Sequence, residues 1–185
     1  MLNQSNNRTW WDRLLIIALA IVPCSCIGTG GDYKTVAFVD LPRFMGDWYV
    51  QGHTPVFFDK DSSDQRESYR LDADGGIVTE YTFKKNGSWN HYLPYGRVYQ
   101  KKTNAHWKMQ FLWPFSSDFL IVGLAPDYGI CVISVPDKDQ IWIMSRERHM
   151  SDLVYQSWVD ELTRDGYATG ELRRVPQGTE PIQKL

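Results

Sequence analysis

Residues 46–53 read Gly46-Asp47-Trp48-Tyr49-Val50-Gln51-Gly52-His53, and this stretch decides the fold. Its apolar residues Trp48 and Val50 alternate with Tyr49 and Gln51. A period of two predicts a β-strand that buries one face and exposes the other. Aromatic residues make up 14% of the chain, and they favour strands because they pack well on a pleated, half-buried surface. The stretch therefore predicts a protein built mainly from β-sheet.

The same alternation recurs farther along the chain, and turn signals separate the alternating runs. Trp107-Met109-Phe111 is one such run and Trp142-Met144 is another. Between runs, dipeptides such as Asn86-Gly87 supply the positive φ angles that tight hairpins need. Eight consecutive strands joined by hairpins indicate an all-β fold, an eight-stranded antiparallel up-and-down β-barrel. We expect the strands at residues 46–53, 66–72, 77–84, 90–100, 105–113, 118–125, 129–135 and 140–146.

Two helical segments flank the predicted strands. A short turn at residues 41–45 follows Asp40 as N-cap and has Pro42 early in the turn. A longer helix begins after Ser151 as N-cap and ends at Gly166. Its apolar face has the spacing i, i+3, i+4, i+7, so we expect it to pack on the outer wall of the barrel. That face consists of Tyr155, Trp158, Val159 and Leu162.

The N-terminal segment resembles a secretory signal peptide. Arg8 and Arg13 precede a nine-residue apolar run at 14–22, and small residues follow it. The run is too short for a spanning helix, which needs about 20 apolar residues. A buried N-terminal helix is the alternative, and Gly28-Thr29-Gly30-Gly31 directly after the run argues against it.

Two cysteines end this segment, in a pattern similar to the lipobox of bacterial lipoproteins. Cys26 follows the small residue Ser25 and is the favoured acylation site, whereas Cys24 follows Pro23, which makes a poor cleavage site. Cleavage without acylation is the remaining alternative. Two or more acyl chains anchor a protein stably to a bilayer. The similarity implies an N-terminal lipid anchor on Cys26, a diacylglycerol and a palmitate. Ile27, the residue after Cys26, is not Asp, which in the enterobacterial sorting scheme implies the outer membrane, so we expect the domain there and facing the periplasm.

The chain accordingly divides into four predicted parts. Residues 1–26 form the signal peptide, 27–35 a flexible tether, 36–176 the barrel domain and 177–185 a disordered tail that begins near Pro176. Residues 170–175 are expected to add a short strand.

Several functional classes find no support in the sequence. The net charge of −2 provides no basic stripe for nucleic acid. The four histidines, at 53, 91, 106 and 149, lack metal-ligand spacing, so no metal is expected. Cys131 has only apolar neighbours, which predicts a buried and inert thiol. We expect no catalysis and no cofactor, and we expect His53 to line the mouth of the barrel or lie on the surface.

Three motifs together make the chain resemble the lipocalins, and specifically the bacterial outer-membrane lipocalins. Gly46-Asp47-Trp48 matches the family's Gly-x-Trp on the first strand, Asp127-Tyr128 matches the turn between the sixth and seventh strands, and Arg146 matches the Arg that closes the eighth strand. The resemblance covers residues 36 to 175. It implies a closed barrel with one C-terminal helix packed outside and an open calyx for a hydrophobic molecule.

Two of the motif residues have a predicted structural role. The first and last strands of a closed barrel are neighbours, so Trp48 and Arg146 can meet at one end. The guanidinium can lie over the indole, a contact worth about 0.5 to 2 kcal/mol. We expect Gly46, Trp48 and Arg146 to close the base of the barrel without doing chemistry.

The inward-facing residues are the predicted ligand contacts. Strand alternation assigns them, although an error of one residue moves a side chain to the outer face. The alternative is that they fill a solid core. The expected calyx residues are Trp48, Val50, Tyr69, Val98, Trp107, Met109, Phe111, Ile121, Trp142 and Met144.

A fatty acid or a lysophospholipid is the expected ligand. Burying about 15 methylenes is worth about 12 kcal/mol, and association costs at least ~4 kcal/mol. The remainder corresponds to a micromolar dissociation constant. The alternatives are a filled barrel that docks to a membrane or a protein through Phe57-Phe58 and Trp113-Pro114-Phe115, a lipocalin-type enzyme, or a haem binder.

Overall fold

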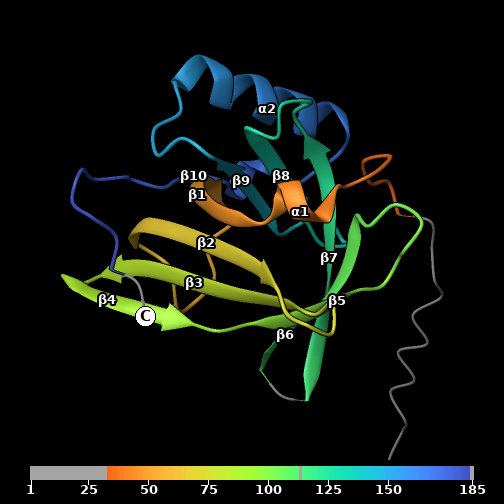
Figure 1. The fold of residues 1–185 in the computed structure, drawn as a ribbon. Coiled ribbons are helices and arrows are strands. Elements are labelled where there is room, and N and C mark those ends of the chain that lie inside the picture. Colours follow the sequence, from red (N-terminus) through yellow and green to blue (C-terminus); the bar gives the residue numbers. More distant parts are fainter. Residues whose placement is uncertain (1–32, 113, 184–185) are drawn as a thin grey trace, which may run out of the picture. The chain divides into compact units, whose positions relative to one another are not determined.

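The strands follow one another around a closed antiparallel sheet (Figure 1). A computed structural model describes residues 33–112 and 114–183, and the predicted signal peptide with Cys24 and Cys26 lies outside these residues. The first strand, β1 (Gly46–His53), pairs with the last barrel strand, β9 (Ile141–Ser145), and this pairing closes the ring. The predicted eight-stranded barrel is confirmed.

The fourth position of the barrel is shared by two short strands. After β2 (Ser63–Leu71) and β3 (Ile77–Lys85), both β4 (Ser88–Tyr92) and β5 (Tyr95–Val98) pair with β3. The single strand expected at 90–100 is broken because Pro94 has no N–H to donate to the ladder. Its carbonyl still accepts from the Thr79 N–H at 3.0 Å, so β4 and β5 keep one register along β3.

The remaining strands complete the meander. They are β6 (His106–Leu112), β7 (Phe115–Leu124) and β8 (Ile130–Ser134), which leads to β9. The short helix α1 (Leu41–Phe44) precedes β1, and the Asp40 side chain accepts from the Arg43 N–H at its start. Phe44 is fully buried and packs on Trp107 with ring centroids 5.3 Å apart. The turn thus fills one end of the barrel.

The long helix α2 (Asp152–Arg164) lies against the outside of the barrel (Figure 1). The Ser151 side chain caps it by accepting from the Val154 N–H, and Gly166 follows its end with φ +79°. Its predicted apolar face packs against the outward side chains of β8 and β9, which are Val132, Ile141 and Ile143. The approach to β1 requires a glycine, because a Cβ on Gly52 would lie 2.3 Å from the Tyr155 hydroxyl.

The C-terminal segment departs from the expected tail. After a 3₁₀ turn, Thr169–Glu171, only Arg173–Arg174 (β10) forms a strand, paired with β1. Residues beyond Pro176, where we expected disorder, lie on the barrel wall: Gln177 Nε2 donates to the carbonyls of Val50 and Gln65 at 2.8 and 3.0 Å. We call residues 173–178 the C-terminal strap.

A gap between β1 and β2 explains the strap. The two strands pair only through residues 46–49 and 66–69, and a bulge follows in each. Beyond that point the backbone groups of β1 and β2 need other partners. The strap supplies them, since the Val175 N–H donates to the Gln51 carbonyl at 3.0 Å and the Pro176 carbonyl accepts from the Asp64 N–H at 2.8 Å.

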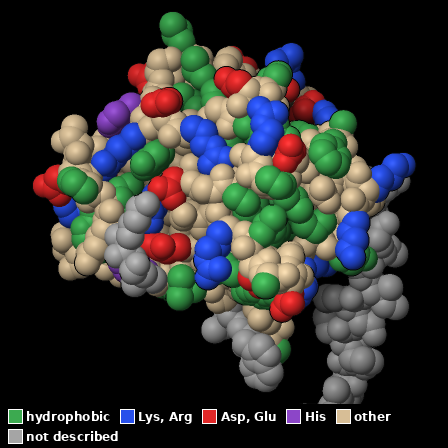
Figure 2. Space-filling model, in the orientation of Figure 1, with side chains coloured by type: hydrophobic (Ala, Val, Ile, Leu, Met, Phe, Trp, Pro, Cys, Tyr) green, Lys and Arg blue, Asp and Glu red, His purple; other side chains and the backbone are tan. Residues whose placement is uncertain are grey.

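The surface carries both signs of charge. On the face shown in Figure 2, Lys and Arg side chains are interspersed with Asp and Glu side chains and do not form one basic stripe.

Within residues 33–112 and 114–183, no helix is both long and apolar enough to cross a bilayer.

Candidate functional site

The base of the barrel is held by one arginine. The Arg146 guanidinium lies 3.8 Å from the centroid of the Trp48 ring. It also donates to four carbonyls in the segment before β1 and at its start, at 2.8 to 2.9 Å. Gly46 has φ +96°, a conformation that strains other residues. The structure therefore brings together the three residues expected at the base, and the carbonyls are those of Arg43, Phe44, Met45 and Asp47.

Most of the expected calyx residues lie in one apolar cluster inside the barrel. Val98 and Trp142 are half-buried and pack against it. Phe111 does not join the cluster and is 49% exposed. The pairing of β6 with β7 shifts between Met109 and Leu112, and such a bulge disturbs the inward–outward alternation. The fully enclosed members are Trp48, Val50, Tyr69, Trp107, Met109, Ile121 and Met144.

Part of the barrel interior, next to the apolar cluster, is polar, which the sequence analysis did not predict. Glu67 and Tyr69 are two residues apart on β2, and they pair with Tyr81 and Thr79 on β3. Partners across a ladder share a face of the sheet, so these side chains face inward with Tyr69. Continuing the alternation from Tyr69 would have found Glu67. We call the polar wall the buried side chains of His53, Asp59, Gln65, Glu67, Thr79 and Tyr81.

The polar wall is linked by hydrogen bonds. Asp59 Oδ2 accepts from the Tyr81 hydroxyl at 3.0 Å and lies 3.6 Å from His53 Nδ1. Gln65 Nε2 lies 3.0 Å from His53 Nε2 and donates to the Ser62 hydroxyl at 2.9 Å.

The second carboxyl group of the polar wall, that of Glu67, accepts a hydrogen bond from the Tyr69 hydroxyl. Three buried polar atoms of the wall have no hydrogen-bond partner, namely His53 Nδ1, Gln65 Oε1 and Thr79 Oγ1.

Burial shifts the pKa values of the titratable groups inside the barrel. Desolvation raises the pKa of Glu67 from 4.5 to about 7, the Tyr69 hydroxyl opposes that rise, and the Asp59 charge adds to it. Desolvation lowers the pKa of His53, against the attraction of Asp59. The same effect raises the pKa of the fully buried Cys131 thiol well above its usual range. A protonated thiol is a weak nucleophile, so Cys131 offers no activated thiolate.

Glu67 predicts a pH dependence of stability. Its folded pKa, about 7, exceeds the ordinary 4.5, so the folded state holds this proton longer than the unfolded state. The contribution to the free energy of unfolding is therefore fully present below about pH 4.5 and is lost as the pH rises to about 7. The loss is about 3 kcal/mol. We expect Glu67→Gln to flatten the profile over this range in urea titrations, whereas a variant as pH-sensitive as the wild type would contradict the assignment.

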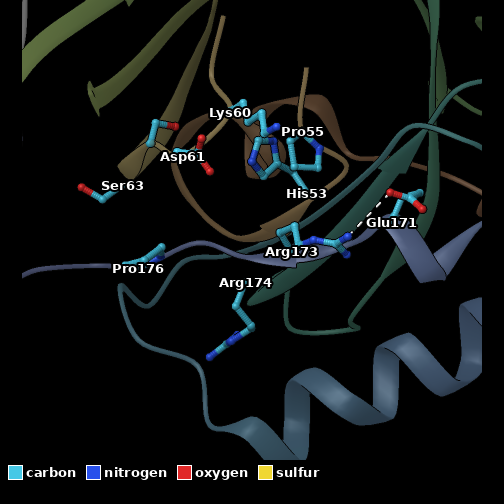
Figure 3. Close-up of a pocket in the computed structure, with 10 residues that line it drawn as sticks. His53, Pro55, Lys60, Asp61, Ser63, Glu171, Arg173, Arg174 and Pro176 are labelled. Atoms are coloured by element: carbon cyan, nitrogen blue, oxygen red, sulfur yellow. Dashed lines mark ion pairs between the residues drawn. The ribbon is translucent and has the colours of Figure 1, made fainter. Parts of the chain in front are cut away.

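A cleft of about 550 Å³ opens beside the polar wall (Figure 3). The cleft lies between the segment at 60–63 and the C-terminal strap, and His53 lines it although only 3% of that residue is exposed. The sequence reasoning placed His53 at the mouth or on the surface; it belongs to both the cleft and the interior wall. Within the described residues, no group of His, Cys, Asp or Glu could hold a metal ion.

Comparisons with known proteins agree with this geometry. The family model described as the lipocalin-like domain matches residues 39–177. Temperature-induced lipocalin-1 of Arabidopsis thaliana is 27% identical over 161 residues, which cover 81% of this chain and 86% of that protein. Outer membrane lipoprotein Blc of Escherichia coli K12 is 27% identical over 164 residues, covering 86% and 92%.

Solved structures show the same fold. Insecticyanin from the tobacco hornworm Manduca sexta superposes with a TM-score of 0.62 at 17% identity, covering 80% of this chain and 86% of that chain. Lobster apocrustacyanin A1 gives 0.59 at 16% identity, covering 76% and 81%. Since the family model spans residues 39–177, well over half of the 185 residues, the chain belongs to the lipocalin family.

Proposed function

We propose that this lipocalin binds the acyl chain of a lipid, a fatty acid or a lysophospholipid, inside its barrel. The observation that carries the proposal is the enclosed apolar cluster that includes Trp107, Ile121 and Met144. Lipocalins as a family bind hydrophobic ligands. Met109 and Met144 also lie in the cluster, and methionine is unbranched and changes rotamer easily. Their movement offers a way to make room for a chain.

The membrane location is part of the same proposal. Blc of Escherichia coli and of Vibrio cholerae are outer membrane lipoproteins by name. Together with the lipobox-like segment, this supports acylation at Cys26, or at Cys24 as the alternative, and attachment to a bacterial outer membrane with the barrel facing the periplasm. Mass spectrometry of the membrane-extracted protein tests it: a triacylated N-terminal Cys26 is expected, and an unmodified N-terminus contradicts the anchor.

A titration tests the lipid proposal. The chain beginning at residue 26 is titrated below the micellar concentration with lysophosphatidylcholines of increasing acyl length. We expect saturable 1:1 binding, micromolar for long chains, that tightens by up to about fourfold per added methylene and then levels off when the interior is full. Calorimetry provides the measurement. Binding that never saturates, or does not depend on chain length, contradicts an enclosed site.

A docking surface is the second candidate function. Phe57 is 90% exposed and Phe115 is 73% exposed, whereas Phe58 packs against Tyr92 with centroids 4.9 Å apart. Trp113 lies outside the described residues. Native mass spectrometry separates the two functions, because co-purified lipid supports ligand carriage and a stoichiometric protein partner supports docking.

A further inference from the structure

We propose that the polar wall recognises a lipid head group that donates hydrogen bonds, an ammonium group above all, and that it rejects a carboxylate anion. The inference rests on the proposed function, since this head group belongs to the ligand whose chain the apolar cluster holds. It deepens that function by naming the chemistry of the head group: of the two proposed ligands, it favours a lysophospholipid with an ammonium head group over a fatty acid, whose head group is a carboxylate.

Among the described residues, neither carboxyl group of the wall is paired with Lys or Arg, and the imidazole beside Asp59, that of His53, has a pKa that burial lowers. Within the described part of the chain, no Lys or Arg forms an ion pair with Asp59 or Glu67, and their side-chain donors are the hydroxyls of Tyr81 and Tyr69. A buried charge is costly unless it is paired. An ammonium placed between these carboxyl groups would supply the missing charge, and a carboxylate would add a third negative group.

The unpartnered atoms also favour a guest that donates. Gln65 is fully buried and its Nε2 is occupied by His53 and Ser62, so the amide offers only its Oε1 acceptor. Thr79 is 2% exposed and its hydroxyl has no partner. Buried polar atoms are almost always hydrogen-bonded in folded proteins. The third unpartnered atom, His53 Nδ1, lies 3.6 Å from Asp59 Oδ2. The groups left for a guest are therefore the Gln65 oxygen, the Thr79 hydroxyl and the carboxyl oxygens, and a donor head group satisfies them.

His53 belongs to both the cleft and the polar wall. It lines the cleft, and its Nδ1 lies 3.6 Å from Asp59 Oδ2. At the rim of the cleft, Arg173 pairs with Glu171 and Arg174 pairs with Asp152, and Lys60 is the third cation that lines it. In Figure 3 the Arg173 side chain is directed toward Glu171.

In the described part of the chain, the titratable groups that interact electrostatically with Glu67 are acids, which disfavour an anion when charged and are otherwise neutral. Asp59 faces it from the segment between β1 and β2, Tyr69 lies on its own strand, Tyr81 is opposite on β3, and Cys131 approaches from β8. Arg146 acts on the pKa values of Tyr69 and Cys131 from the base, and it is already bound to four carbonyls.

Three ligands with one chain length test the inference. Dodecylamine, dodecanol and dodecanoate are titrated separately at pH 8, below their micellar concentrations, into the chain beginning at residue 26. We expect dodecylamine to bind at least tenfold more tightly than dodecanoate, with dodecanol between them. Glu67→Gln should reduce the amine-to-carboxylate ratio at least fivefold, and Asp59→Asn should act in the same direction. Glu161→Gln, an exposed carboxylate on α2, is the matched control and should keep the wild-type ratio.

The outcomes separate the inference from the proposed function. Dodecanoate binding as tightly as dodecylamine overturns the head-group preference and leaves lipid binding intact. If the preference exists but both Glu67→Gln and Asp59→Asn retain it, the polar wall is not its source and the assignment is overturned. If none of the three ligands binds, lipid binding itself fails and the inference fails with it. The titrations of the wild-type protein alone can contradict the head-group preference, so the inference remains testable even if a variant folds poorly.

Discussion

Arg146→Met is expected to lower the free energy of unfolding by about 3 kcal/mol. The substitution keeps an apolar stem over Trp48 but removes the cation from its ring, 3.8 Å away, and the donors from four carbonyls. Hydrogen bonds from a charged donor contribute about 1.5–3 kcal/mol each. The expected loss is smaller than the sum of four such bonds. Arg43 is exposed, so water can replace the lost donor at the Arg43 carbonyl.

Urea unfolding followed by tryptophan fluorescence measures the loss. Arg70→Met is the matched control, since Arg70 is exposed on β2 and surface changes shift stability by only about 0.5 kcal/mol. The unfolding free energy of Arg146→Lys should lie between those of the wild type and Arg146→Met, because an ammonium keeps the charge but cannot reach the same set of carbonyls. Equal stability of Arg146→Met and Arg70→Met would show that the base is closed by apolar packing alone.

The base of the barrel was predictable because its residues are constrained by local patterns and by ring closure. The alternation from Trp48 and the N-cap at Asp40 each act over a few residues. Closure then makes β1 and β9 neighbours. The break at Pro94 also follows from its missing N–H, although we expected a single strand at residues 90–100.

The polar wall and Phe111 were harder because bulges shift the alternation. The pairing of β2 with β3 shifts between Ser63 and Arg66, so Gln65 cannot be assigned to a face by counting from Tyr69. The shift after Met109 likewise leaves Phe111 half-exposed. A bulge depends on both strands of a pair, and one strand's sequence does not reveal it.

The C-terminal strap was missed for a different reason. Its residues show no periodic pattern. They are ordered because they fill a gap between β1 and β2, which lie more than 100 residues earlier in the chain. In the sequence, a segment that contacts distant backbone groups cannot be told from a polar tail. Its position follows only from the carbonyls of β1 and β2 that have no partner in a neighbouring strand and that the strap pairs with.

A stop after Arg174 is expected to cost about 3 kcal/mol of unfolding free energy. The truncation removes Val175, which is 6% exposed in the core cluster, and burying such a side chain is worth about 1.5–3 kcal/mol. It also removes the Gln177 bonds to Val50 and Gln65 and the bond from the Gly178 N–H to Asp64. Net hydrogen bonds of about 0.5–1.5 kcal/mol each are partly offset by the chain entropy that the shorter tail no longer loses.

A stop after Pro181 is the matched control for this truncation. It keeps Glu180, whose carbonyl accepts from Arg148 and whose carboxylate pairs with Lys84, so stability should change by no more than about 0.5 kcal/mol. Urea unfolding gives both values, and hydrogen exchange should show a faster Asp64 amide only in the shorter chain, because that amide donates to the Pro176 carbonyl. A freely moving tail would make the two truncations equally stable and leave the exchange of Asp64 unchanged. The strap would then not be a part of the barrel wall, and the rim beside His53 would be open.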